Sequence, residues 1–137
     1  MYPVELTIPM ARDLTDFGFE SLSDESQVIQ ALEEKDGTLL LVVNSVCGCA
    51  AANARPGAKM AIANGKRPDR CATVFAGVDR QATDKAREYL LPYPPSSPAI
   101  ALFKDGSLVH MLERHHIEGR SAQIIADNLI GAFEEYC

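Results

Sequence analysis

Residues 38–49 read TLLLVVNSVCGC, and this stretch decides the fold. The continuous apolar run between polar residues is typical of a central strand that is buried on both faces. An Ala-rich segment follows over residues 50–63 and predicts a helix, because Ala is the best helix former. Pro56 lies inside this segment and is expected to kink the helix, because proline lacks a backbone donor. Cys47 and Cys49 therefore lie between a buried strand and the start of a helix.

The rest of the chain predicts an alternation of helices and strands around this unit. Three further strands are expected over residues 71–78, 99–103 and 108–112, and Lys104-Asp105-Gly106 is a hairpin signal between the last two. Strands separated by helices favour parallel neighbours in a layered α/β domain. We predict one domain over residues 1–137, with a central mixed four-stranded sheet flanked by helices. Residues 1–20 show no clear period and are expected to form an N-terminal extension.

Helix-capping residues mark the expected boundaries of two of these helices. Ser21 and Ser23 are both candidate caps of a helix with an apolar side at Val28, Ile29 and Leu32, and Gly37 can end it. A further helix is expected from Asp79 or Thr83 to Leu91. Ser121 is the expected cap of a final helix, whose apolar face holds Ile125, Leu129, Phe133 and Tyr136.

The composition excludes several classes of function. The chain has 137 residues, 47% of them hydrophobic, and a formal net charge of −6, so no nucleic-acid partner is implied. No apolar run is long enough to span a bilayer, and the N-terminus does not resemble a secretory signal. We therefore expect a cytoplasmic protein. Cysteines are seldom structural disulfides there, so its four cysteines need another role: packing, metal binding or redox chemistry.

The position of Cys47 and Cys49 favours redox chemistry. A helix start offers free backbone N–H groups and a partial positive charge, and both stabilise a thiolate. The thiolate is the nucleophile of thiol–disulfide exchange. Cys47 is closer to the loop and is expected to be the more exposed nucleophile, with Cys49 as the resolving thiol. Asn44 and Ser45 are expected to donate hydrogen bonds near the thiolate, and no acid or base close in sequence suggests a proton carrier.

Only Gly48 separates the two cysteines, and this spacing predicts a small, strained disulfide ring. Glycine relaxes the backbone as far as any residue can, yet strain makes a disulfide easier to reduce. The pair should therefore be a weaker reductant, and a better oxidant or exchange catalyst, than a Cys-x-x-Cys site. A redox potential as low as about −270 mV would contradict this expectation.

Other sulfur and imidazole groups leave alternatives open. Cys71, His115 and His116 are candidate metal ligands, but their spacing matches no zinc pattern. Cys71 is more simply a buried small residue. Cys137 is the last residue, and is either an incidental exposed thiol or a third redox thiol.

Pro98 follows Ser97 and opens an apolar strand, which is an allowed place for proline. An X-Pro bond adopts the cis form at small cost. A cis Ser97–Pro98 bond would expose a backbone edge where a substrate chain could pair. An ordinary trans proline is the alternative.

Several segments together resemble the bacilliredoxin family. The active-site match is VNSVCGCAA at residues 43–51. Similarity covers nearly the whole chain and includes Pro9-Met10, Ala54-Arg55-Pro56, VFAG at 74–77, PSSP at 95–98, Arg114-His115, IEG at 117–119 and Cys137.

The resemblance implies a thioredoxin-like fold and a thiol–disulfide oxidoreductase that reduces mixed disulfides between cytosolic proteins and bacillithiol, a small thiol that replaces glutathione in some bacteria. Cys47 would take the bacillithiol and Cys49 would act second. Pro98 matches the cis-proline that faces the active cysteines, so Gly48, Ser97 and Pro98 are the expected substrate contacts. Bacillithiol is implied as a substrate, with no resident cofactor.

Three alternatives stay open: a general protein disulfide isomerase, a non-enzymatic redox sensor and a metal-binding module. Arg55 and the Arg114-His115-His116 segment are either solvated side chains or a cationic surface for the carboxylates of bacillithiol.

Overall fold

A computed structural model describes residues 2–137 and places β2 (Thr38–Asn44) at the centre of the sheet. Every residue of β2 is buried, as its apolar run predicts. On one side it pairs in parallel with β3 (Arg70–Phe75), and on the other it pairs antiparallel with β4 (Ala99–Lys104). The chain therefore leaves the sheet at the carboxyl end of its central strand, and the two cysteines follow there.

The sheet has five strands in the order β1-β3-β2-β4-β5, so the expectation of four strands needs a correction. The four expected strands are β2 to β5, with β5 over Ser107–Leu112. The fifth is β1 (Glu20–Ser21), two residues that pair in parallel with β3. Asp105 and Gly106 both have positive φ, 51° and 82°, which confirms the tight hairpin between β4 and β5.

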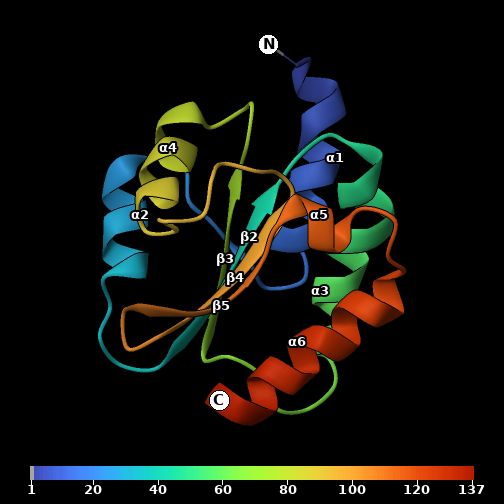
Figure 1. Cartoon of the computed structure of the whole chain (residues 1–137). Helices are drawn as coiled ribbons and strands as arrows, with labels where there is room; N and C mark the ends of the chain where they lie inside the picture. Colours follow the sequence, from blue (N-terminus) through green and yellow to red (C-terminus); the bar gives the residue numbers. More distant parts are fainter. Residues whose placement is uncertain (1) are drawn as a thin grey trace.

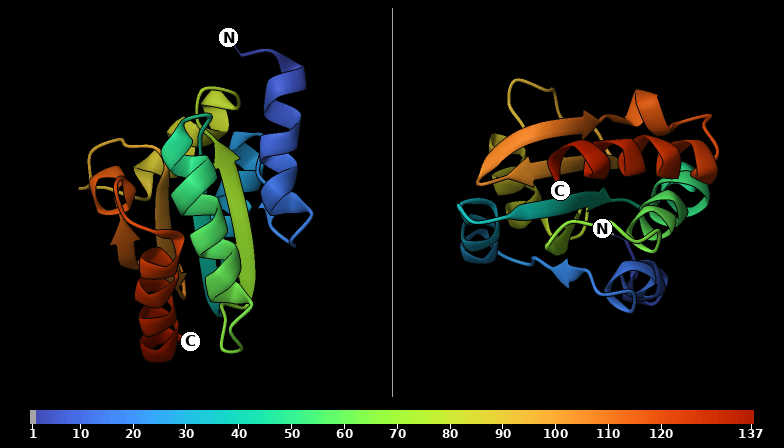
Figure 2. Two further views of the ribbon diagram at one scale, coloured as in Figure 1. Left: turned by 90° about the vertical axis from the view of Figure 1, so that its right-hand side faces the viewer. Right: turned by 90° about the horizontal axis from the view of Figure 1, so that it is seen from below.

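Helices cover both faces of the sheet (Figures 1 and 2). One face carries α2 (Glu25–Leu32) and α4 (Arg80–Glu88). The other carries α1 (Val4–Thr15), α3 (Arg55–Ile62) and α6 (Ala122–Tyr136). Side chains alternate along β2, so that Leu40 and Val42 enter the core under α3 and α6 while their neighbours enter the core under α2 and α4.

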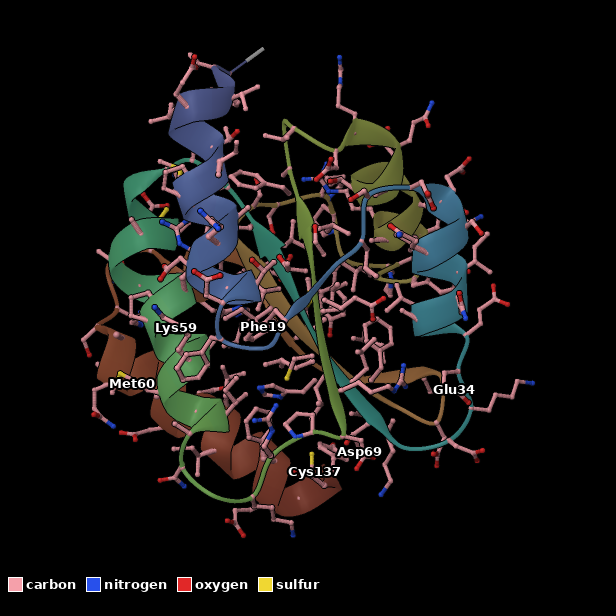
Figure 3. All side chains as sticks on the ribbon, turned by 180° about the vertical axis from the view of Figure 1, so that it is seen from behind. Phe19, Glu34, Lys59, Met60, Asp69 and Cys137 are labelled. Carbon is pink, nitrogen blue, oxygen red and sulfur yellow. The ribbon has the colours of Figure 1, made fainter. Side chains whose placement is uncertain are left out.

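The N-terminal region differs from the expectation because residues 4–15 form a regular helix, α1. Only Thr7 and Leu14 of α1 are buried, whereas Val4, Leu6 and Ile8 are exposed, so burial in this helix does not follow its apolar residues. Phe19, just after α1, points into the core (Figure 3) and is 3% exposed. The cap of α2 is Asp24, which accepts from the Gln27 N–H, and neither Ser21 nor Ser23 fills that role. The capping of α6 by Ser121 is confirmed.

The expected helix over residues 50–63 is divided into two parts. A π-helical turn, η1 (Ala50–Ala54), comes first, and α3 follows with Pro56 in its first turn. The Arg55 N–H bonds to the Ala50 carbonyl, so the π-helical turn continues directly into α3 at the proline. Gly57 lets α3 approach α6 closely, since a Cβ at this position would lie 2.7 Å from Ile125 Cγ2. Within residues 2–137, no helix is both long and apolar enough to cross a membrane.

Candidate active site

The two cysteines lie in the turn between the end of β2 and η1, and their sulfurs are 2.8 Å apart. Both residues are half-buried, so the expected difference in exposure does not distinguish them. A pocket of about 280 Å³ opens beside Cys47, and Ser97 and Arg114 are among its lining residues. Gly48 is exposed and Pro98 is buried, and neither lines this pocket.

Hydrogen bonds distinguish Cys47 from an ordinary thiol. Burial alone would raise the pKa of Cys47, but hydrogen bonds from the Cys49 thiol, the Ser45 hydroxyl and the backbone N–H groups of Ala50 and Cys49 lower it overall. The Ser45 Oγ is 3.1 Å from the Cys47 Sγ. The Ser45 hydroxyl and the first backbone N–H groups of η1 thus lie where they favour the thiolate form of Cys47.

Cys49 has the opposite tendency. Burial raises the pKa of the Cys49 thiol, and the neighbouring Cys47 sulfur raises it further. The lower pKa therefore belongs to Cys47, and the raised pKa of Cys49 favours its protonated form beside the Cys47 sulfur. The two neighbouring thiols thus differ in their tendency to ionise, and Cys47 is the one that more readily becomes a thiolate.

Arg55 is a buried side chain that hydrogen-bonds the residues before this turn. The expectation that it is a solvated side chain is therefore wrong. It is 4% exposed and donates to Asn44 Oδ1 at 2.9 Å and to the Ser45 carbonyl at 3.2 Å. Its Nε also pairs with Asp13 of α1 at 2.9 Å. The Asn44 side chain accepts from the Ser45 N–H, so it positions Ser45 and does not itself reach the thiolate. This network holds the residue that hydrogen-bonds Cys47.

Arg114 lines the pocket beside Cys47 and is hydrogen-bonded to Ser97, another residue of its lining. It belongs to the short helix α5 (Arg114–Ile117), and its Nη1 donates to the Ser97 carbonyl at 3.0 Å. The Ser97–Pro98 bond is cis, as expected. Glu118, Cys49 and Cys47, in that order, raise the pKa of Arg114, so its charge lies near both sulfurs.

Of the three candidate metal ligands, His115 and His116 lie together, whereas Cys71 lies apart from them in the core. Cys71 is 6% exposed in the core under α3 and α6, which confirms its packing role. His115 and His116 are exposed and lie beside Glu113, with ligand atoms within 4.8 Å of one another. The His116 Nδ1 already accepts from the Glu113 N–H.

Two pocket residues were missed by sequence reasoning: Tyr2 and Arg87. Arg87 lies in the polar helix α4, where an arginine has the appearance of an ordinary surface residue. Tyr2 belongs to the segment interpreted as an extension. No local pattern connects either residue to Cys47, because the contacts are made across the fold.

Comparison with known proteins gives a full-length match. The model of a protein family described as Disulphide isomerase matches residues 2–137. The chain is 55% identical over 135 residues to a bacilliredoxin of Cytophaga hutchinsonii, covering 98% of this chain and 99% of the relative. It is 49% identical over 137 residues to a bacilliredoxin of Bacillus cereus, covering 99% and 95% of the two chains.

Solved structures show the fold. A putative oxidoreductase with a thioredoxin fold superposes with a TM-score of 0.64 at 17% identity, covering 85% of this chain and 97% of that one. Mitochondrial thioredoxin 3 of Saccharomyces cerevisiae gives 0.61 at 16% identity, covering 90% and 98%. The expected thioredoxin-like fold is confirmed.

Proposed function

The chain belongs to the bacilliredoxin family and is a thiol–disulfide oxidoreductase, and on that premise we propose that it removes bacillithiol from cytosolic proteins through Cys47. The observation that carries the proposal is the contrast between two touching thiols. The pKa of Cys47 is lowered and that of Cys49 is raised, while their sulfurs lie 2.8 Å apart. One sulfur is ready to attack, and the other is ready to act second.

The exchange proceeds in two steps. The Cys47 thiolate attacks the bacillithiol sulfur of the mixed disulfide, and the protein sulfur leaves with the electron pair of the broken bond. Cys49 then loses its proton and attacks the Cys47 Sγ, which releases bacillithiol as a thiolate. One mixed disulfide and two cysteine thiols thus become one protein thiol, one bacillithiol and a Cys47–Cys49 disulfide, which an external thiol must reduce.

A single-turnover experiment tests the proposal without an external reductant. A bacillithiolated test protein is mixed with excess reduced wild type, Cys47→Ala, Cys49→Ala or Cys71→Ala, and both proteins are weighed by mass spectrometry. We expect wild type and Cys71→Ala to remove the thiol, Cys49→Ala to retain it as an adduct on Cys47, and Cys47→Ala to leave the test protein unchanged. Transfer by Cys47→Ala, or none by wild type, would overturn the proposal.

General disulfide isomerisation is the second candidate, and the description of the matching family model favours it. An isomerase would restore activity to a protein with scrambled disulfides and would show no preference for bacillithiol. Comparing the rates on the scrambled and on the bacillithiolated protein, with the same preparation, decides between the two substrates.

A further inference from the structure

The pocket beside Cys47 carries positive charge in a chain that is acidic overall. The formal net charge is −6, yet Arg87 and Arg114 both line this pocket, and no carboxylate does so within residues 2–137. The pocket volume of about 280 Å³ is near the lower limit of small-molecule sites, roughly 300 Å³. The space therefore suits a ligand of about the size of an amino-acid derivative.

Arg87 is the unusual member of this lining. Its Nε is buried, and in the part of the chain that the structure describes it has no hydrogen-bond partner. A buried N–H without an acceptor is unfavourable, so most such groups in proteins are satisfied. Arg87 approaches the pocket from α4, on the face of the sheet opposite to α3. A ligand in the pocket that offers a hydrogen-bond acceptor would satisfy the Arg87 Nε.

Arg114 approaches the same pocket from the opposite wall, and it is held in place. Its Nη1 donates to the Ser97 carbonyl at 3.0 Å, its backbone N–H donates to Ser96 Oγ at 3.3 Å, and its Nε donates to Glu118 at 3.2 Å. The guanidinium therefore stays beside the cysteines without having to be ordered by a ligand. Its charge favours an anion bound next to Cys47.

We propose that Arg87 and Arg114 form a carboxylate-binding site that holds the acid group of a small thiol while its sulfur is exchanged at Cys47. This inference rests on the proposed function and specifies its substrate class: low-molecular-weight thiols that carry a carboxylate. The planar fork of arginine matches the two oxygens of a carboxylate, which gives direction as well as charge. The site orients the substrate, and the bond changes remain those of Cys47 and Cys49.

The test uses two probe thiols that differ only in the acid group. A test protein is capped either with N-acetylcysteine or with N-acetylcysteine amide, and the second-order rate constant for removal of each cap is measured. Wild type should remove the acid about tenfold faster than the amide. Arg87→Gln should bring this ratio close to one. Lys85→Gln, which removes one charge from the same helix, should leave the ratio as in wild type.

Arg114→Gln provides a second variant, at a side chain that is 43% exposed, and it should also lower the ratio. An acid-to-amide ratio near one in wild type, or a ratio that survives in both arginine variants, would overturn the carboxylate site while leaving the oxidoreductase function intact. A protein that removes neither cap would instead contradict the proposed function. If Arg87→Gln slows both caps equally, Arg87 supports the fold or Cys47, and the site is likewise overturned.

Discussion

The two ends of the sheet each hold a cysteine, and the pKa values of these two thiols are shifted in opposite directions. Cys47 follows the carboxyl end of β2, and hydrogen bonds lower its pKa. Cys71 lies near the start of β3, and burial raises its pKa although the Arg67 Nη2 is 3.7 Å from its sulfur. Cys137 lies at this second end too, close enough to Cys71 that its sulfur also raises the pKa of Cys71. At Cys71 burial thus outweighs the neighbouring arginine, whereas at Cys47 the hydrogen bonds outweigh burial.

Selective alkylation tests the largest difference between the two ends. At pH 7, iodoacetamide should modify Cys47 about 100-fold faster than Cys71, because reactivity follows the thiolate fraction and access to the sulfur. Because the pKa of Cys47 is lowered and that of Cys71 is raised, the alkylation rate of Cys47 should reach half of its maximum at a lower pH than that of Cys71. Peptide mass mapping over a pH series gives both rates. Equal rates at the two cysteines would remove the basis of the comparison.

Two arginine variants, one at each end of the sheet, compare how much each end contributes to the stability of the fold. Arg55→Met should lower the free energy of unfolding by about 2 kcal/mol, because Asn44, the Ser45 carbonyl and a partly exposed Asp13 each lose one donor, and the guanidinium charge beside Asp13 is lost. Arg67→Met, at the other end, should change it by less than about 0.5 kcal/mol, since Arg67 is exposed. Urea unfolding of both variants measures the difference. Similar losses would show that the Arg55 network is not special.

Removal of the Ser45 hydroxyl tests how much its hydrogen bond stabilises the Cys47 thiolate. Ser45→Ala should raise the pKa of Cys47 and slow its alkylation at pH 7 roughly threefold to tenfold, because one of the donors to the sulfur is lost. Ser107→Ala, in the exposed hairpin, is the matched control and should behave as wild type. An unchanged midpoint in Ser45→Ala would assign the whole effect to Cys49 and the backbone.

Cys71→Ala should produce the smallest effect. We expect a loss of about 1 kcal/mol in the free energy of unfolding, from the buried volume of one sulfur atom, and no change in the rate of thiol removal. A fall in that rate with unchanged stability would mean that the second end of the sheet takes part in the exchange.

The sequence was informative where one apolar pattern determines one element. The run over residues 38–45 predicted β2, and the position of Cys47 after it predicted the thiolate site. It was uninformative for α1, whose two buried residues, Thr7 and Leu14, give no periodic stripe. It was misleading for Arg55, because its ion-pair partner Asp13 lies in that unrecognised helix. It missed Arg87, because a pocket that joins α4, α5 and β2 has no signature in any one segment.

The strand order also has a consequence for biosynthesis. β2 is the first of the long strands to leave the ribosome, but both of its neighbours lie later in the chain, and the second, β4, ends at residue 104. β2, which leads to Cys47 and Cys49, therefore cannot pair with both of its neighbouring strands until most of the protein has been made. The nascent chain carries Cys47 and Cys49 well before the sheet can position them.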